Sequence, residues 1–259
     1  GDGFGTFNIS TTAAFIAAGA GVKVAKHGNR AASSMTGSAD LLEALGFDLE
    51  LGPDEVQRMV REAGFGFFFA PRFHPAMRHA VPVRRELGVR TVFNFLGPLC
   101  NPGGARMSIG ASDPRMAKLM IDVLAARGLD RAFVFYGEEG LDELSTAGPS
   151  RIYRLVDGEI TEAEFTPEDF GIARSPISDL AGGGPEENLA ITRDVLAGVP
   201  GARSDAAVIN AAPAIVLAGI AEGFVDAVGA ARESIASGAA QQALERSLTL
   251  NEQLAETSP

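Results

Sequence analysis

The sequence predicts an α/β fold with a mostly parallel central sheet flanked by helices. Two observations lead to this fold class. Short apolar runs, typical of buried strands, alternate with longer stretches of helical period along most of the chain, which is the order that βαβ units produce. The chain has 259 residues, 46% of them apolar, which is enough to bury the core of one large domain.

The first third of the chain supplies this alternation in order. We expect a helix of small residues over 11–20 and a buried strand, ending in a polar loop, over 22–28. A helix over 38–46 has a serine at its start as a candidate N-cap and a glycine at its end. Another helix over 53–64 begins with proline and ends with glycine, and the apolar run 65–71 predicts a short strand.

The middle of the chain continues the pattern with one exception. Residues 74–87 have a helical pattern with an internal proline, and a further helix is expected over 114–127. The apolar run 131–137 predicts a strand. The exception is residues 151–165, which predict a β-hairpin because Asp157-Gly158 is a strong signal for a tight turn between two alternating runs.

The last third of the chain, from Pro185 onward, is mostly alanine-rich helix. The glycine run 182–185, which precedes it, is expected to form a mobile loop. The sequence contains no internal repeat and no low-complexity linker. We therefore expect one domain in which strands and helices alternate.

Composition excludes several classes of protein. Asp and Glu total 33 against 22 Lys and Arg, a net charge of −11, whereas nucleic-acid binders normally carry a basic excess. The apolar runs are shorter than the roughly 18 residues that suggest a membrane span. Cys100 is the single cysteine, so no internal disulfide can form. We expect a cytoplasmic protein with no nucleic-acid and no membrane partner.

The opening stretch GDGFGTFNIST, residues 1–11, predicts an anion site. Glycines at 1, 3 and 5 let backbone N–H groups approach an anion closely, and NIST adds an amide and hydroxyls where a helix begins. Asp2 is better explained as a partner for a sugar hydroxyl or a metal-bound water. The alternative is a plain glycine turn followed by an N-cap.

A second polar loop, KHGNR at residues 26–30, follows the strand predicted over 22–28. It carries two cations, a histidine and an amide, and ASSMTGS after it ends at Ser38 and adds further hydroxyls. Open α/β sheets place ligands at the carboxyl ends of strands. One helix and one strand separate the two loops, so they meet at one edge of the sheet and can close on one polyanion. The alternative is a solvated loop.

Two further clusters are candidates for ligand binding. Asp142 and Glu143 in GLDELS follow the strand predicted over 131–137, and Mg²⁺ is commonly held by one or two carboxylates together with substrate phosphates. Acidic pairs on loops are common, so the alternative is a solvated surface. The second cluster is basic, and one of its members could bind a carboxylate bidentately. Its members are Arg72, His74, Arg78, Arg84, Arg85 and Arg90.

Taken together, these stretches resemble the anthranilate phosphoribosyltransferase family through nearly the whole chain. The likeness implies an α/β phosphoribosyltransferase domain over 1–259, in which about 69–100 contributes to a small helical domain. The family's glycine motif resembles GTGGDG, so this chain enters at its last three residues and lacks the family's N-terminal helices. The matching stretches are GDGFGTFNIST, VAKHGNRAASS, GSADLLEALG, FAPRFHPAM, PVRRELGVRTVFNFLGPLCNP, GLDELS and PEDFG.

The resemblance implies transfer of a phosphoribosyl group from PRPP to anthranilate with release of pyrophosphate, the second step of tryptophan biosynthesis from chorismate, with Mg²⁺ as cofactor. It assigns Mg²⁺ to Ser10, Asp142 and Glu143, and anthranilate to Asn29, Arg84, His27 and His74. We assign no general base, because the amine of anthranilate can attack without one. The residues implied to contact PRPP are Gly1, Asp2, Thr6, Asn8, Ile9, Ser10, Thr11, Lys26, His27, Gly28, Asn29, Arg30, Ala31, Ala32, Ser33, Ser34 and Ser38.

Three departures and three alternatives accompany this resemblance. Met35 stands where many relatives have Lys, which reduces the positive charge expected near the phosphates. Cys100 replaces a usual Thr, with little effect expected. The family is expected to be a homodimer, and without the N-terminal helices we expect an exposed apolar face around 69–100, a compromised dimer contact and weak activity or aggregation.

The alternatives are a nucleic-acid-binding relative of the same fold, a nucleoside phosphorylase of related architecture, and an inactive fragment.

Overall fold

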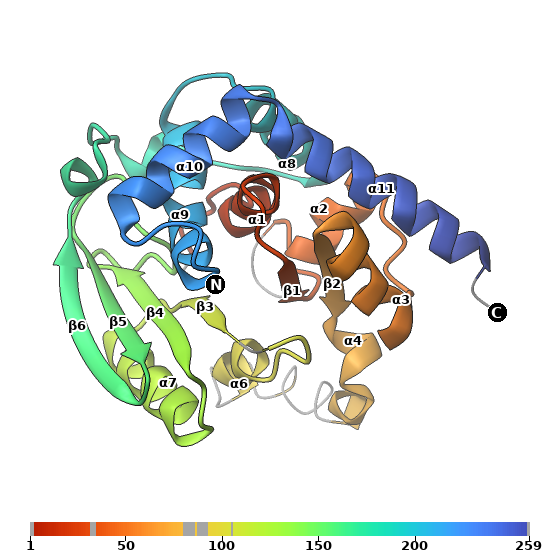
Figure 1. The fold of residues 1–259 in the computed structure, drawn as a ribbon, viewed down its shortest axis with the longest axis horizontal. Helices are drawn as coiled ribbons and strands as arrows, with labels where there is room; N and C mark the ends of the chain where they lie inside the picture. Colours follow the sequence, from red (N-terminus) through yellow and green to blue (C-terminus); the bar gives the residue numbers. More distant parts are fainter. Residues whose placement is uncertain (1–2, 32–34, 80–85, 87–92, 105, 258–259) are drawn as a thin grey trace.

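Two separate β-sheets organise the protein, which we describe from a computed structural model over residues 3–31, 35–79, 86, 93–104 and 106–257 (Figure 1). In the smaller sheet, β1 (Val24–Gly28) pairs in parallel with β2 (Phe65–Phe69). The larger sheet has the strand order β3-β4-β5-β6. Its strands are β3 (Met107–Gly110), β4 (Arg131–Gly137), β5 (Ser150–Val156) and β6 (Glu159–Phe165).

The expectation of a mostly parallel central sheet is corrected by the larger sheet, which is mixed. Strands β3 and β4 are parallel because helix α7 (Pro114–Ala126) returns the chain between them. Strands β4 and β5 are antiparallel, and so are β5 and β6. No helix lies in the connection 138–149, and the predicted turn Asp157-Gly158 joins β5 to β6 with positive φ values of 50° and 86°.

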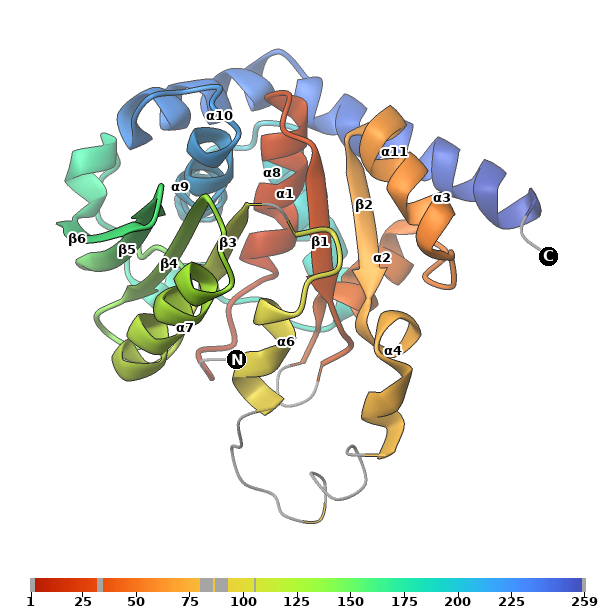
Figure 2. The same ribbon diagram turned by 60° about the horizontal axis from the view of Figure 1, so that its bottom comes forward.

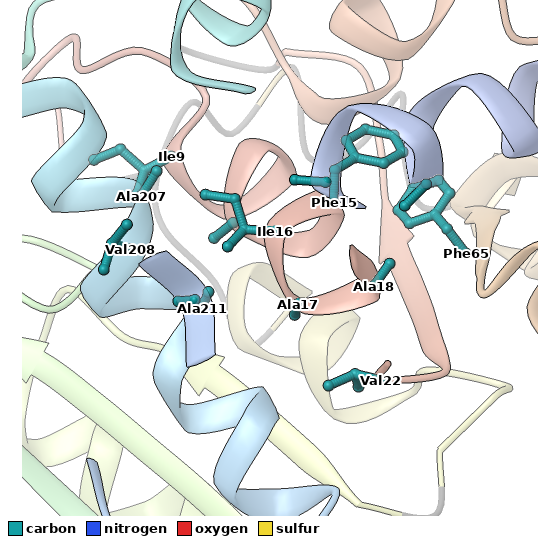
Figure 3. Packing of buried hydrophobic residues seen from close by; sticks show 14 of the residues in the cluster. Ile9, Phe15, Ile16, Ala17, Ala18, Val22, Phe65, Ala207, Val208 and Ala211 are labelled. Carbon is teal, nitrogen blue, oxygen red and sulfur yellow. The ribbon is translucent and has the colours of Figure 1, made fainter. Parts of the chain in front are cut away.

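Helix α1 (Ile9–Gly19) lies at the centre of the molecule and is covered by helices from the other end of the chain (Figure 1). Its residues Phe15, Ile16 and Ala17 are fully buried, as expected for a helix whose polar side chains are confined to its first turn, at Ser10, Thr11 and Thr12. Figure 3 shows these side chains between α9 and β2. The covering helices are α8 (Pro185–Leu196), α9 (Ala202–Leu217), α10 (Phe224–Ala236) and α11 (Ala239–Thr257).

Small residues make this close packing possible. A Cβ atom on Gly19 would lie 2.3 Å from Ser234 Oγ and 2.5 Å from the backbone nitrogen of Ala240, so the end of α1 passes directly against the turn between α10 and α11. A second, smaller core lies between α7 and the larger sheet, where Met120 and Ile121 are buried against the strands. The larger sheet separates the two cores, because alternate residues of β4 belong to different ones: Phe133 and Phe135 to the larger core, Val134 and Tyr136 to the smaller.

Several predicted elements are confirmed near their expected ends. Helix α2 (Ser38–Leu45) stops at Gly46, whose φ is 106°, although Gly37 rather than Ser38 is its N-cap. Helix α3 (Pro53–Arg58) continues as a π-helical turn over Met59–Ala63 and stops at Gly64. The glycines end these helices because they adopt the left-handed conformation that other residues avoid.

The segment 69–100 contains short helical pieces. They are α4 (Ala70–Phe73), a 3₁₀ turn over Pro75–His79 and α6 (Phe93–Leu99). The helix predicted over 74–87 is therefore a 3₁₀ turn at its start, and most of its remainder lies outside the described residues. Strand β3 and helix α6 were not predicted. None of the helices in the described part of the chain combines the length and apolar character needed to cross a bilayer.

Candidate active site

A cleft of about 730 Å³ is lined by residues of both sheets, from β1 and from β3. Figure 2 shows these two strands as the ones that face each other. Helices α1 and α9 form part of its wall. Ser10, Lys26, Asp142 and Glu143 all line it. The three loops singled out separately in the sequence thus contribute to one hollow, whose volume is typical of small-molecule sites.

The loop before α1, residues 3–8, is held by the glycine run that precedes α8. The N–H of Phe7 donates to the carbonyl of Leu180 at 2.8 Å, and the N–H of Gly182 donates to the carbonyl of Gly5 at 3.0 Å. A Cβ atom on Gly182 would lie 2.5 Å from Phe7 Cα, so glycine is needed for this contact. The run expected to be a mobile loop is instead packed and hydrogen-bonded.

Asn8 connects the start of α1 to two distant segments. Its N–H donates to Asn188 Oδ1 at 2.8 Å, and its side-chain Nδ2 donates to the carbonyl of Thr36 at 3.1 Å. Thr11, which is fully buried, donates through Oγ1 to Asn8 Oδ1 at 2.7 Å. Ile9 is also buried in the core. A contact of Thr11 or Ile9 with PRPP would therefore come from the backbone, because their side chains point inward.

Lys26 and Ser10 lie side by side in the cleft. The Nζ atom of Lys26 donates to Ser10 Oγ at 3.2 Å, joining the end of β1 to the start of α1. Burial lowers the pKa of Lys26 to about 8, and the negative charge of Glu143 acts in the opposite direction. The carboxylate loop is thus close enough for the charge of Glu143 to affect the pKa of the Lys26 ammonium group in the same cleft.

His27 and His74 contact each other across β1 and α4. Their Nε2 atoms are 3.1 Å apart, and their rings are nearly perpendicular at 86°. Burial, and to a smaller extent the charge of His74, lower the pKa of His27 to about 4. His27 is therefore neutral at neutral pH, and one ring of the pair donates a hydrogen bond that the other accepts.

The loop after β1 is held by α2 rather than by the cleft. Arg30 donates to both carboxylate oxygens of Glu43, at 2.7 and 2.9 Å, and to Asp40 at 3.2 Å. Asp40 also accepts the N–H groups of Ala31 and Gly37, at 2.9 and 2.8 Å. These bonds direct the Arg30 guanidinium toward the acids of α2.

Asn29, Gly28 and Ser38 complete the described part of this loop. Asn29 accepts the N–H of Arg30 through its side chain at 2.8 Å. A Cβ atom on Gly28 would lie 2.1 Å from Ser38 Oγ, so the two residues are in direct contact. Six predicted site residues lie outside the described residues, namely Gly1, Asp2, Ala32, Ser33, Ser34 and Arg84.

The carboxylate loop, residues 138–149, is held by α9 and by close contact with β3. Asn210 accepts the N–H of Leu144 at 2.8 Å and donates to the carbonyl of the same residue at 3.0 Å. A Cβ atom on Gly110 would lie 1.7 Å from the carbonyl oxygen of Asp142, so β3 must have glycine here. These contacts hold Asp142 and Glu143, both half-buried, against the cleft.

The donor set fits Mg²⁺ bound together with a phosphorylated substrate. In the described part of the chain, no three His, Cys, Asp or Glu side chains form a metal-binding group by themselves. Mg²⁺ is often held by one or two carboxylates and completes its shell with phosphate oxygens and water. Asp142 and Glu143 supply such a pair in the cleft that Lys26 also lines.

Sequence reasoning missed the residues that support this site, above all Asn188 and Asn210. Both are buried, and both bond to backbone groups of a functional loop. Thr36 was seen only as one hydroxyl in a run, but it donates to the carbonyl of Gly183 at 2.7 Å. A signal was present at Asn210, which is a lone amide in the apolar run VINAAPAIV. A buried amide of this kind needs hydrogen-bond partners.

Comparisons with known proteins agree with this fold. A family model described as "Glycosyl transferase family, a/b domain" matches residues 1–241. The anthranilate phosphoribosyltransferase of Moorella thermoacetica is 52% identical over 246 residues, covering 95% of this chain and 73% of that protein. The corresponding protein of Desulfatibacillum aliphaticivorans is 48% identical, with the same coverage of 95% and 73%.

Solved structures give the same result. The crystal structure of anthranilate phosphoribosyltransferase from Thermus thermophilus superposes with a TM-score of 0.91 at 49% identity, covering 97% of this chain and 75% of that one. The Saccharomyces cerevisiae enzyme in complex with PRPP and Mg has a TM-score of 0.90 at 31% identity, covering 98% and 72%. The fold and the matched domain define a glycosyl transferase with a mixed α/β domain. Within that class, the chain belongs to the anthranilate phosphoribosyltransferase family, enzymes of tryptophan biosynthesis.

Proposed function

We propose that this cleft transfers the phosphoribosyl group of PRPP to the amine of anthranilate and releases pyrophosphate. The observation that carries the proposal is that Ser10, Lys26, Asp142 and Glu143 line one hollow. The yeast relative that contains PRPP and Mg, and another yeast structure that contains 4-fluoroanthranilate, support the same two substrates for this chain. In the yeast complex with 4-fluoroanthranilate the TM-score is 0.88 at 30% identity.

The pyrophosphate end of PRPP lies, in this proposal, between the start of α1 and Lys26. The first N–H groups of a helix attract anions, and the loop before α1 directs them toward the cleft through its bonds to Asn188 and Leu180. The ammonium group of Lys26 adds a positive charge 3.2 Å from Ser10 Oγ. Together they stabilise the negative charge that develops on the leaving pyrophosphate.

Asp142, Glu143 and Ser10 would hold Mg²⁺ in this cleft. When bound, the ion neutralises phosphate charge and supports departure of the leaving group. The carboxylates are positioned for this by Asn210 and by the contact between Gly110 and Asp142. Because the protein offers two carboxylates here, the ion depends on the phosphates for further ligands.

Anthranilate would approach from the side of β1 and α4, near Asn29, Arg84, His27 and His74. The amine attacks the sugar carbon as the bond to pyrophosphate breaks, and its extra proton leaves to solvent. No general base is needed, so positioning of the two substrates supplies most of the rate. His27 stays neutral, so it adds no positive charge beside the carbon where positive charge develops.

The remaining proposals concern assembly. We propose a cytoplasmic homodimer, in which about 69–100 belongs to a small helical domain, as expected from the family. Sedimentation velocity over a range of protein concentrations tests the dimer, and a monomer at every concentration contradicts it.

Product formation from PRPP, anthranilate and Mg²⁺, followed by the change in anthranilate fluorescence, tests the function. We expect the signal to require all three components and to fall at least about 100-fold in kcat/KM for Glu143→Gln, because the metal loses a charged ligand. Asp122→Asn is the matched control, since Asp122 pairs with Lys118 on the solvent-facing side of α7. Unchanged turnover in Glu143→Gln, Lys26→Met and Ser10→Ala would refute the assignment.

The rival functions are tested with the same protein. A nucleic-acid-binding protein would retain labelled DNA at moderate salt, and a nucleoside phosphorylase would consume nucleoside and inorganic phosphate. We expect neither activity, because Ser10, Lys26 and the carboxylate pair share one cleft in a chain of net charge −11.

A further inference from the structure

The pair formed by His27 of β1 and His74, the residue that ends α4, has a geometry that the transfer reaction does not explain. Their Nε2 atoms lie 3.1 Å apart, and the two rings are nearly perpendicular, at 86°. Both side chains are half-buried, and His27 lines the cleft. The two nitrogen atoms therefore face each other at a place that solutes in the cleft can reach.

Packing of β1, β2 and α4 fixes the two rings in place. In the parallel pairing of the smaller sheet, His27 lies opposite Phe68 of β2. The ring of Phe68 contacts the ring of Phe73 in α4, with centroids 4.9 Å apart, and His74 is the next residue. The N–H of His74 donates to the carbonyl of Ala70 at 2.9 Å, which closes the turn. Figure 2 shows α4 directly after the end of β2. Both backbone segments are thus held before any ligand binds.

The protonation of His27 leaves its Nε2 atom available as a ligand. Its pKa of about 4 means that the ring is neutral at neutral pH. A hydrogen bond to the carbonyl of Gly97 raises this pKa by less than burial lowers it, and because Nε2 faces His74, the bond comes from Nδ1. A neutral imidazole with its proton on Nδ1 has an unshared electron pair on Nε2. Histidines that bind metals usually donate their other ring N–H to a carbonyl or carboxylate in this way.

The separation of the two Nε2 atoms is close to the separation that a metal ion requires. Zn–N bonds of about 2.0–2.1 Å at a tetrahedral angle place two nitrogen ligands about 3.3–3.4 Å apart. The observed 3.1 Å is about 0.2–0.3 Å shorter, so small rotations of the rings are sufficient. Without an ion, the Nε2–H of His74 donates to His27. When an ion binds, that proton moves to Nδ1 of His74, and both rings remain neutral.

The imidazole ligands select the class of ion. Zn²⁺, Cu²⁺ and Ni²⁺ bind imidazole nitrogen, whereas Mg²⁺ prefers the oxygen ligands that Asp142 and Glu143 offer. The charge of Lys26, which also lowers the pKa of His27, repels any cation here, so only ions with a strong affinity for nitrogen should bind. Within the residues that the structure describes, no third His, Cys, Asp or Glu completes a metal-binding group with the pair. Water would therefore fill the other positions, and the ion should exchange more readily than one in a structural site with four protein ligands.

We infer that His27 and His74 form a binding site for one exchangeable transition-metal ion of the Zn²⁺ class, which links β1 to α4 through the two Nε2 atoms. The site is separate from the carboxylates to which Mg²⁺ is assigned above. This inference concerns the histidine pair and is independent of the reaction proposed above, so its test does not use turnover.

The ring nitrogen signals of the unmodified protein test the inference. The histidines are labelled with ¹⁵N, and Zn²⁺ is added in the presence of excess Mg²⁺, which competes for the carboxylates. His79, the third histidine of the sequence, is exposed on the turn after α4 and serves as the internal control. We expect the Nε2 signals of His27 and His74 to shift together and to saturate at one ion per chain, while those of His79 stay in place. No shift, or a shift of only one ring of the pair, would overturn the inference.

Calorimetric titration with Zn²⁺, again in excess Mg²⁺, measures the contribution of each ring. Loss of a group that only orients a metal ligand costs about 10–100-fold in affinity, so His27→Gln and His74→Gln should each weaken binding at least about 100-fold. Circular dichroism checks that each variant is folded, and His74, at the end of a short helix, is the position less essential to folding. His79→Gln is the matched control and Cys100→Ser a second, since both residues are exposed and both variants should bind as the unmodified protein does. Unchanged binding in His74→Gln, or loss of binding in Cys100→Ser, would contradict the pair as the site.

Discussion

The two loops that face each other across the cleft are fixed in different ways. The loop before α1 is held by bonds to several distant segments, through Leu180, Asn188, Thr36 and the glycine run around Gly182. The carboxylate loop is held at Leu144 by the side chain of Asn210, at Asp142 by contact with β3, and at Thr146 by two bonds from Ser175. Both bonds to Leu144 come from one side chain, so loss of Asn210 should affect the carboxylate loop more than loss of Asn188 affects the loop before α1.

The comparison also shows where a functional loop obtains its position. Ser10 and Glu143 lie in the first and middle thirds of the chain, but Asn188 and Asn210 lie in the helices of the last third. Both amides are buried, and each bonds to backbone groups of its loop. The residues that perform the chemistry and those that place them are thus far apart in the sequence.

The largest effect is expected at the contact with β3. Gly110→Ala adds a Cβ atom that would lie 1.7 Å from the carbonyl oxygen of Asp142, so the carboxylate loop must move. A displacement of this order costs about 100-fold in activity when it misplaces a catalytic group. We expect at least that loss in kcat/KM and a higher Mg²⁺ requirement, both measured by anthranilate fluorescence.

Gly229→Ala is the matched control for this substitution. Gly229 lies within α10, and a Cβ atom there meets no heavy atom within 4 Å. Alanine favours a helix over glycine by about 0.5–1 kcal/mol, so this variant should be slightly more stable and fully active. Equal activity of the Gly110 and Gly229 variants would show that the carboxylate loop tolerates displacement.

The next effect compares the two buried amides directly. Asn210→Ala leaves the N–H and C=O of Leu144 without their partner, and should lower the free energy of unfolding by about 2–4 kcal/mol. Asn188→Ala should cost about 1–2 kcal/mol, because its loop keeps the bonds at Phe7 and Gly182. Urea unfolding measures both. A larger loss of stability for Asn188→Ala than for Asn210→Ala would contradict the difference between the two loops.

A pH titration examines β1, which lies between the two loops. The pKa of His27 is lowered to about 4 in the folded protein, below its ordinary value of 6.5. The unfolded chain therefore binds a proton that the folded chain does not, so stability falls as the pH decreases from about 6.5 to about 4. His27→Gln should reduce this fall in urea unfolding, and His79→Gln, at an exposed position, should not. Identical pH profiles for the unmodified protein and both variants would show that His27 does not cause the loss of stability at low pH.

The smallest effect is expected at the loop after β1. Glu43→Gln weakens the bidentate pairing with Arg30, but both side chains are exposed, at 47% for Arg30 and 56% for Glu43. Exposed ion pairs contribute about 0–1 kcal/mol, so thermal unfolding should change little. A large loss of stability would mean that this loop depends on this one exposed pair.

Much of the fold and site was accessible from sequence because the signals are local. Glycine at 46 and 64, the turn Asp157-Gly158 and the apolar run of β4 each determine structure through their own conformational preferences. The polar loops were also recognisable, since NIST and KHGNR are contiguous. Their meeting at one cleft followed from the number of elements between them.

The rest depends on contacts between residues far apart in the chain. Asn188 bonds to a residue 180 positions away, and Asn210 to one 66 positions away, so no local pattern specifies either pair. The mixed larger sheet was not predicted, because the connection 138–149 between β4 and β5 contains no helix. Without a helix there, the direction of β5 relative to β4 is determined by tertiary packing. Strand β3 was not predicted, because Met107–Gly110 is short and contains a glycine. That glycine is required by the close approach of Asp142 and does not favour a strand.

The central position of α1 has a consequence for synthesis on the ribosome. Beyond its first turn this helix is apolar, and three of the helices that cover it, α9, α10 and α11, are translated last. At ~5–20 residues per second, it waits on the order of 10–50 s before its cover emerges. During that interval the nascent chain exposes an aggregation-prone apolar segment. Chaperone binding to residues 9–19 should therefore govern how much of the protein reaches the native state in the cell.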